Sequence, residues 1–215
     1  MSLDPWGNTF WSLNALYIHD GVSKRPHVAL SDTVHASGYF NSFILAERPR
    51  LLSKPIDELL VKMRLGRPGS LQSFDAVIGS ADGSIPVAFE VARQTDCRFG
   101  YTEKQGDGRV LRRFDVRRNR LVLVVEDVIT TGQEAVKTIM AIEALGGQVY
   151  PMIGTLLSLL SGETLATPVG ELPVVALSRT GFDTWSVAEC PLCRLGSRAI
   201  ARPRANWKDL TTSLK

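Results

Sequence analysis

The residues best suited to chemistry in this 215-residue chain lie in one stretch, 121–132, which reads Leu-Val-Leu-Val-Val-Glu-Asp-Val-Ile-Thr-Thr-Gly. Residues 130–132 offer hydroxyls and backbone N–H groups at the start of an expected helix, a favourable seat for a phosphate dianion. Glu126 and Asp127, just before them, would accept hydrogen bonds from sugar hydroxyls or act through hydrated Mg²⁺, which prefers carboxylate and phosphate oxygens. An anion-binding site next to acceptors for vicinal hydroxyls is the combination that a ribose 5-phosphate requires.

The same stretch predicts the elements that must hold this site. Five apolar residues, 121–125, followed by charge and then a turn, suit a strand buried on both faces of a sheet. Residues 133–145 place apolar side chains at helical spacing and end at two glycines. In open α/β sheets the ligand binds at the carboxyl ends of the strands, where this loop would lie. A buried strand followed by a carboxylate-capped helix, without a ligand, is the alternative interpretation.

A second strand, loop and helix precede this unit. Residues 75–78 predict a strand, and residues 85–94 predict a helix with proline in its first turn. The loop 79–84 between them reads Gly-Ser-Ala-Asp-Gly-Ser and consists mainly of small residues. Turns before helices are often rich in glycine and serine, so this loop by itself is weak evidence for a site.

Positive charge is concentrated in the segment that follows. Residues 97–102 predict a strand, and residues 103–109, Glu-Lys-Gln-Gly-Asp-Gly-Arg, predict a mobile loop. Loops that close over a reaction exclude water and bring charge to the leaving group. Six arginines lie close together here: Arg109, Arg112, Arg113, Arg117, Arg118 and Arg120. A solvated basic hairpin is the alternative.

The rest of the chain predicts one α/β domain with a small addition. The further elements expected are a helix over 9–20, strands within 27–45, a helix over 52–65 with Pro55 near its start and 66–69 as its end, and strands over 148–157 and 174–177. The chain then divides into three parts: an N-terminal hood over the carboxyl edge of the sheet (1–66), a core with a parallel sheet flanked by helices (67–180), and a C-terminal tail that packs on the core (181–215).

Composition narrows the class of protein. A net charge of +3 gives no indication of nucleic-acid binding, and no apolar run reaches the roughly 18 residues of a membrane helix. The N-terminus lacks the features of a signal peptide, and three cysteines argue against a disulfide framework. We therefore expect a cytoplasmic enzyme. The pair Cys190 and Cys193 lacks nearby third and fourth zinc ligands, which favours a structural or vestigial role over a metal or redox one.

The stretch 121–132 resembles the phosphoribosyl diphosphate (PRPP) signature of the type I phosphoribosyltransferases. From about residue 28 to 200 the chain is similar to their orotate branch, including the flexible loop over 103–113 and the Glu-Cys-Pro-Leu-Cys tail. The resemblance implies the type I phosphoribosyltransferase fold with its N-terminal hood. It implies transfer of the ribosyl 5-phosphate group from PRPP to orotate, giving orotidine 5′-phosphate and diphosphate in pyrimidine synthesis. It also implies Mg²⁺ and a homodimer.

The resemblance implies roles for individual residues. Lys104, Asp127, Arg109 and Arg112 would be catalytic, with Lys104 reaching the diphosphate of a neighbouring subunit. PRPP would be bound by residues of two loops, namely Glu126, Asp127, Val128, Ile129, Thr130, Thr131, Gly132, Gln133 and Glu134, with Ser80, Ala81, Asp82 and Gly83. The base would be bound by Tyr39, Phe40 and Thr130. Mg²⁺ would be held mainly through PRPP, near Glu126 and Asp127.

Two positions depart from the orotate pattern. After the strand at 148–157 the family has Asp-Arg, whose arginine reads the orotate carboxylate and ring oxygens, whereas this chain has Ser158-Leu159. Near the N-terminus Asp32-Thr33 replaces a Ser-Gly pair. Losing a bidentate arginine from an anion-reading site should cost several kcal/mol unless another group replaces it. Two alternatives therefore stay open: a phosphoribosyltransferase for another base, and a non-catalytic regulator that binds PRPP or a nucleotide on the same fold.

Overall fold

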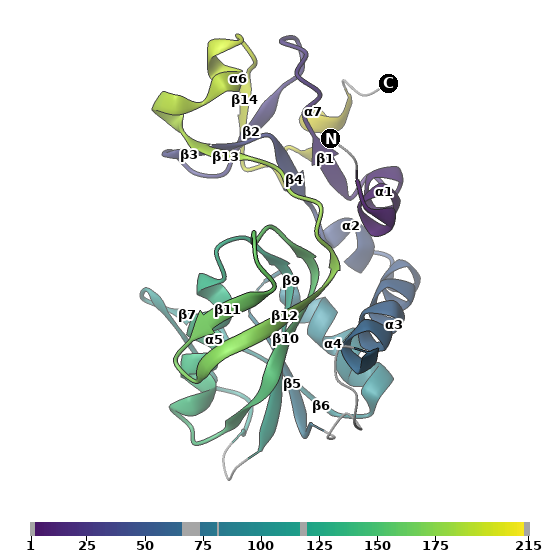
Figure 1. Cartoon of the computed structure of the whole chain (residues 1–215), viewed down its shortest axis with the longest axis vertical. Helices are drawn as coiled ribbons and strands as arrows, with labels where there is room; N and C mark the ends of the chain where they lie inside the picture. Colours follow the sequence, from purple (N-terminus) through teal and green to yellow (C-terminus); the bar gives the residue numbers. More distant parts are fainter. Residues whose placement is uncertain (1–2, 66–73, 81, 117–119, 213–215) are drawn as a thin grey trace. The chain divides into compact units, whose positions relative to one another are not determined.

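The computed structural model describes residues 3–65, 74–80, 82–116 and 120–212. The chain forms two compact units, each with its own strands and helices (Figure 1). The first unit combines Met1–Ile44 with Thr180–Lys215, and the second is Leu45–Arg179.

The second unit is built on a six-stranded sheet with the order β11-β12-β10-β9-β5-β6. Its strands are β5 (Ala76–Gly79), β6 (Arg98–Tyr101), β9 (Leu121–Ile129), β10 (Gln148–Ser158), β11 (Thr164–Thr167) and β12 (Gly170–Ser178). All neighbouring pairs are parallel except β11 and β12, which form an antiparallel pair at the edge. The predicted parallel sheet is therefore confirmed, and β11 is a strand that the sequence analysis missed.

Strand β9 lies inside the sheet, between β10 and β5, and its apolar side chains are buried on both faces. On one face Val122 and Val124 pack in a buried cluster with Ile139 of α5 (Gln133–Glu143). On the other face Val125 lies beside Gly154, where an added β-carbon would be 3.2 Å from the sulfur of Met63 in α3 (Pro49–Leu65). Helices α3 and α4 (Ser84–Thr95) thus cover one face of the sheet and α5 covers the other (Figure 1).

The helices of the second unit match the predictions with one correction. Helices α4 and α5 lie where they were expected. Helix α3 begins at Pro49, three residues earlier than predicted, so Pro55 lies inside the helix and not near its start. Pro55 is buried on the apolar face of α3 with Ile56. The free energy gained by this burial offsets the cost of the helix hydrogen bond that proline cannot donate. The expected end of the helix at 66–69 lies outside the described residues.

The expected mobile loop after β6 folds as a hairpin. Strands β7 (Glu103–Gln105) and β8 (Gly108–Val110) are antiparallel, and Gly106 at the turn has φ +57. Strand β8 packs along α5 of the same unit. Arg117 and Arg118 of the basic segment lie outside the described residues.

The first unit contains two small sheets. Strands β1 (Leu16–Ile18) and β4 (Gly38–Phe40) form an antiparallel pair. The second sheet has the order β13-β3-β2-β14, with β13 (Thr184–Ser186), β3 (Val34–Ala36), β2 (His27–Ala29) and β14 (Ala199–Ala201). The helices are α1 (Pro5–Ser12), α2 (Phe43–Ala46), which begins at the end of this unit, η1 (Val187–Glu189), α6 (Pro191–Arg194) and α7 (Trp207–Thr211).

The predicted helix over 9–20 is wrong in its second half. Helix α1 ends at Ser12, and the chain returns as β1. The reason is a Schellman motif: Asn14 has φ +59, its N–H donates to Trp11 O, and the N–H of Ala15 donates to Phe10 O at 2.8 Å. Residues 16–18, Leu-Tyr-Ile, form a short apolar run that suits a strand as well as a helix, so periodicity alone did not separate the two.

The units also differ from the three parts expected from the sequence. Strand β14 pairs in parallel with β2, and β13 pairs with β3, so the C-terminal segment completes the N-terminal sheet. The boundaries fall after Ile44 and after Arg179 instead of at 66 and 180, and α3 belongs to the second unit. A hood over the edge of the parallel sheet stays a prediction. None of the helices in the described part of the chain is long and apolar enough to cross a membrane.

Candidate active site

The carboxyl end of β9 opens onto a small pocket. The pocket is lined by Glu126, Val128, Ile129, Thr130, Thr131, Gly132, Gln133, Glu134 and Ala135. All of these except Ala135 belong to the predicted PRPP-binding set. Gly132 is required at its position because it has φ +82 and because an added β-carbon would lie 2.3 Å from Leu165. The loop therefore wraps tightly into the start of α5 and leaves a concave surface at a helix N-terminus.

Hydrogen bonds join the two predicted PRPP loops. Glu126 is 2% exposed, and its Oε2 accepts hydrogen bonds from Ser80 Oγ at 2.5 Å and Ser84 Oγ at 2.6 Å. The Ser84 hydroxyl also lies 3.1 Å from Oδ1 of Asp127. Ser84 was not among the predicted residues. Its signal in the sequence was its hydroxyl at the first position of the helix that follows the small-residue loop.

Gly83 allows the loops to approach. A β-carbon at Gly83 would lie 2.1 Å from Oδ2 of Asp127, closer than any real contact. Gly83 is buried, Asp82 is exposed, and Ala81 lies outside the described residues. Any side chain at position 83 would collide with the Asp127 carboxylate, so the packing of the two loops accounts for the glycine at this position.

Burial dominates the electrostatics of Glu126. Burial raises the pKa of Glu126 to about 7, against the hydrogen bonds from Ser80 and Ser84, and the charges of Asp127 and Arg109 act in opposite directions. Oε1 of Glu126 has no hydrogen-bond partner among the described residues although it is buried. A buried acceptor of this kind suits a hydroxyl donor or a metal-bound water.

Of the predicted catalytic cations, the structure places Arg109 at the pocket. Its guanidinium donates to Oε2 of Glu134, with Nε at 2.7 Å and a terminal nitrogen at 2.6 Å, and its side chain is 10% exposed. Lys104 lies opposite Arg109 in the hairpin and is exposed, and Arg112 is exposed in the loop after β8. Arg109 therefore pairs with a pocket residue of its own chain, while Lys104 extends into solvent.

The predicted base-binding residues fall in different units. Tyr39 and Phe40 lie on β4 in the first unit, and Thr130 lies in the second. Phe40 is 3% exposed, and its ring centroid is 4.9 Å from that of Phe10. Phe40 is thus a core residue of the first unit, whereas Tyr39 is half-buried beside Trp207 at 6.1 Å between centroids. Binding of the base by these residues stays a prediction.

The two residues that replace Asp-Arg lie beside the pocket. Ser158 is in register with Ile129, and the N–H of Leu159 donates to Ile129 O at 2.8 Å. Ser158 is 1% exposed and its Oγ accepts from the N–H of Leu160 at 3.3 Å. This strand end therefore presents a hydroxyl and an apolar side chain where the family pattern has an arginine.

The comparisons with known proteins agree with this geometry. No family model matches the sequence. The chain is 31% identical over 198 residues to an orotate phosphoribosyltransferase of Campylobacter jejuni subsp. doylei, in an alignment that covers 88% of this chain and 96% of that one. It is 33% identical over 186 residues to an orotate phosphoribosyltransferase of Wolinella succinogenes, which covers 81% and 87%.

Solved structures match at the level of the fold. The orotate phosphoribosyltransferase from Aeropyrum pernix has a TM-score of 0.55 at 23% identity and covers 90% of both chains. The adenine phosphoribosyltransferase from Saccharomyces cerevisiae has a TM-score of 0.52 at 17% identity and covers 65% of this chain and 86% of the other.

Together the parallel sheet and the strand-end pocket define the type I phosphoribosyltransferase fold. Because relatives more than 30% identical match over most of both chains, the chain belongs to the orotate phosphoribosyltransferase family.

Proposed function

We propose that the protein transfers the ribosyl 5-phosphate group from PRPP to orotate, forming orotidine 5′-phosphate and diphosphate. The pocket at the end of β9 carries this proposal, because it combines a helix N-terminus with the buried carboxyl group of Glu126. Asp127, the next residue, is partly exposed. Relatives that match over most of the chain are named orotate phosphoribosyltransferase, which supports orotate as the acceptor.

In this proposal the pocket binds the ribose 5-phosphate half of PRPP. Backbone N–H groups and hydroxyls of Thr130, Thr131 and Gly132 would hold the 5′-phosphate at the N-terminus of α5. The carboxylates of Glu126 and Asp127 would accept hydrogen bonds from the ribose hydroxyls. Glu126 suits this task, since its buried Oε1 has no hydrogen-bond partner in the described part of the chain.

The diphosphate would be bound by the loop before α4 and by cations. The small residues of this loop, Ser80 and Gly83 among them, would let its backbone approach the diphosphate closely. Lys104, with Arg109 and Arg112, would neutralise the departing charge. Mg²⁺ would lie near Glu126 and Asp127, held mainly through PRPP, and would supply further positive charge to the diphosphate oxygens.

The chain would act by positioning and charge stabilisation. Displacement at the anomeric carbon builds positive charge on the ribose ring, and the acidic pair at the end of β9 would stabilise it. Holding the phosphate and the hydroxyls fixes the anomeric carbon relative to the incoming ring nitrogen. Lys104 would then stabilise the negative charge that develops on the leaving diphosphate.

A second candidate is a phosphoribosyltransferase for another base. Ser158 and Leu159 favour it, because they offer no cation to a carboxylated ring. Arg179 follows β12, the neighbour of β10, but its guanidinium donates to the carbonyl oxygens of Val174 and Gly162.

The test is diphosphate release from PRPP and Mg²⁺ with orotate, uracil, adenine, guanine, hypoxanthine and xanthine supplied one at a time. Release with orotate alone is the expected result. Release with another base would assign the second candidate. PRPP binding without release with any base would contradict both and favour a non-catalytic regulator.

We also propose a homodimer in the cytoplasm. Exposed Lys104 is available to a neighbouring subunit, and the three cysteines are free thiols, as a reducing compartment maintains them.

A further inference from the structure

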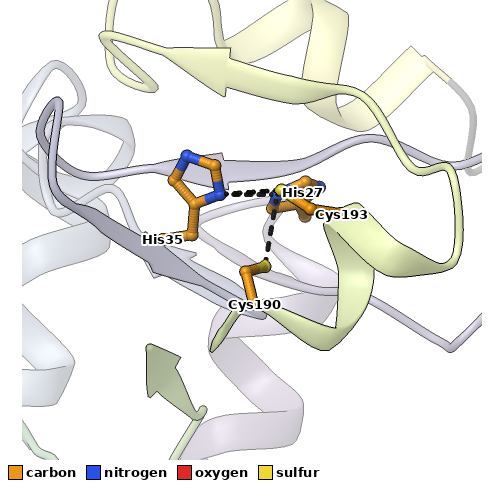
Figure 2. A group of neighbouring side chains, drawn as sticks. All are labelled: His27, His35, Cys190 and Cys193. Carbon is orange, nitrogen blue, oxygen red and sulfur yellow. Dashed lines mark hydrogen bonds between the residues drawn. The ribbon is translucent and has the colours of Figure 1, made fainter. Parts of the chain in front are cut away.

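A cluster of metal-binding side chains lies in the first unit, apart from the pocket of the second. Its members are His27 of β2, His35 of β3, Cys190 directly before α6, and Cys193 within α6. One donor atom from each residue lies within 4.8 Å of the other three. Figure 2 shows the side chains converging from the N-terminal strands and the C-terminal helix.

We propose that these four residues bind one structural zinc ion. Their donor atoms already approximate a tetrahedron: Nε2 of His27 lies 3.0 Å from Nδ1 of His35, 3.6 Å from Sγ of Cys190 and 3.4 Å from Sγ of Cys193. Nδ1 of His35 lies 3.2 Å from Sγ of Cys193. Zinc bonds of about 2.3 Å to sulfur and 2.0–2.1 Å to nitrogen give tetrahedral edges of roughly 3.3 to 3.8 Å. The four distances given above lie within a few tenths of an ångström of these edges, and all four donor atoms lie within 4.8 Å of one another.

A hydrogen-bond chain orients one of the imidazoles. Ser197 donates its hydroxyl to Arg25 O at 2.6 Å, so at 2.9 Å its oxygen accepts from Nδ1–H of His27. This fixes the tautomer of His27 and leaves the lone pair of Nε2 directed toward the cysteines. Metal-binding histidines commonly donate their second N–H in this way.

The donor set selects the metal and its role. Two thiolates with two imidazoles suit Zn²⁺, whereas Mg²⁺ and Ca²⁺ prefer oxygen ligands. Four protein ligands fill the tetrahedral coordination sphere, so no position is open for a substrate or a reactive water. His27 and Cys190 are fully buried and His35 is 7% exposed, which keeps water from most of the site. The site is thus structural.

The ion would join segments that lie far apart in the sequence. Cys193 and His27 are separated by 166 residues, and between β3 and Cys190 the chain forms the whole of the second unit. Binding requires both thiols to lose their protons to solvent, and the energy of the four bonds then stabilises only the folded first unit. The third and fourth ligands, which the cysteine pair lacked in its own neighbourhood, are the two histidines.

The primary test is the metal content of the full chain, purified with a thiol reductant and without chelator. We expect about one zinc per chain by elemental mass spectrometry. Cys193→Ser, which alters the exposed ligand, should lose most of this zinc. Cys97→Ser is the matched control, because Cys97 lies in the second unit and its Sγ donates to Phe74 O at 3.1 Å; it should retain the zinc. Equal zinc in both variants would overturn the proposal.

A second measurement uses the unmodified sequence and does not depend on the folding of a variant. Protein stripped with a chelator is titrated with zinc against a chromophoric chelator, and its thiols are then alkylated and counted by mass spectrometry. We expect saturable uptake with Cys97 alone alkylated, and a thermal midpoint that rises with zinc and falls with chelator. Absence of uptake, with all three thiols alkylated or with a Cys190–Cys193 disulfide that persists under reductant, would refute the site.

Discussion

The hydroxyl of Ser84 lies 2.6 Å from Oε2 of Glu126 and joins the first residue of α4 to the end of β9, 42 residues later. Ser80 adds a second hydrogen bond to the same oxygen at 2.5 Å. These bonds make one site from two loops that the sequence presents separately. The other oxygen of Glu126 is buried and has no hydrogen-bond partner among the described residues.

Replacing Ser84 with alanine should weaken PRPP binding while the fold is retained. The variant removes the donor that Ser84 presents to Glu126 and Asp127. Losing a hydrogen bond to a charged group costs about 1–2 kcal/mol, so the KM for PRPP should rise roughly 5- to 30-fold. Steady-state kinetics and PRPP calorimetry would measure it. Ser12→Ala, an exposed site in the first unit, is the control; an unchanged KM in Ser84→Ala would contradict the role assigned to Ser84.

Gly83→Ala should abolish PRPP binding through a steric clash. Its φ of −66 is acceptable to alanine, so backbone strain is not the cause. The new β-carbon would lie 2.1 Å from Oδ2 of Asp127 and would displace that carboxylate. Gly162→Ala is the matched control, since no heavy atom lies within 4 Å of its added β-carbon. Binding equal to that of the control would show that Asp127 does not contact PRPP.

Mixing two inactive variants should test whether Lys104 acts across a dimer interface. Lys104→Ala removes the leaving-group cation, and Asp127→Asn removes a carboxylate of the ribose site. If Lys104 serves the neighbouring subunit, unfolding and refolding the two together should restore about a quarter of wild-type activity, because half of the dimers are mixed and each has one complete site.

If the mixture stays inactive although native mass spectrometry finds mixed dimers, Lys104 acts within its own chain. The pairing of the neighbouring Arg109 with Glu134 of the same chain makes that outcome informative. Each variant refolded alone is the control and should remain inactive.

Glu90 should make stability fall at acid pH. It accepts hydrogen bonds from Arg93 on its own helix and from Ser53 of α3, and these, led by the Arg93 contact, lower its pKa to about 2. A carboxyl whose pKa is lower in the folded state stabilises the protein above its unfolded pKa, and the contribution disappears as pH falls from 4.5 toward 2.

Glu90→Gln should therefore lower the free energy of unfolding by about 1–3 kcal/mol at pH 7 and by progressively less below pH 4.5. Urea denaturation at pH 7 and pH 3.5 would measure both values. The control is Glu143→Gln, an exposed site, which should change neither. If the difference in free energy of unfolding between Glu90→Gln and the wild type is as large at pH 3.5 as at pH 7, the charge of Glu90 does not cause the loss of stability.

The strand, loop and helix that carry the candidate site could be predicted from the sequence alone, because the residues that specify them are contiguous. The apolar run of β9, the acidic pair, and the turn that begins α5 occupy 23 successive residues, Leu121–Glu143. Their local pattern predicts strand, loop and helix without knowledge of any distant partner. The same holds for α4 and for the loop before it, whose small residues predict a turn at the start of a helix.

Contacts between residues far apart in the sequence became visible only in the folded structure. Pairing of β14 with β2 assigns the C-terminal tail to the N-terminal sheet, and no periodicity in either segment specifies that pairing. The proximity of His27 and His35 to Cys190 and Cys193 follows from the same pairing. Local propensity acts over a few neighbouring residues, whereas pairing and side-chain clusters depend on contacts that form only when the chain folds back on itself.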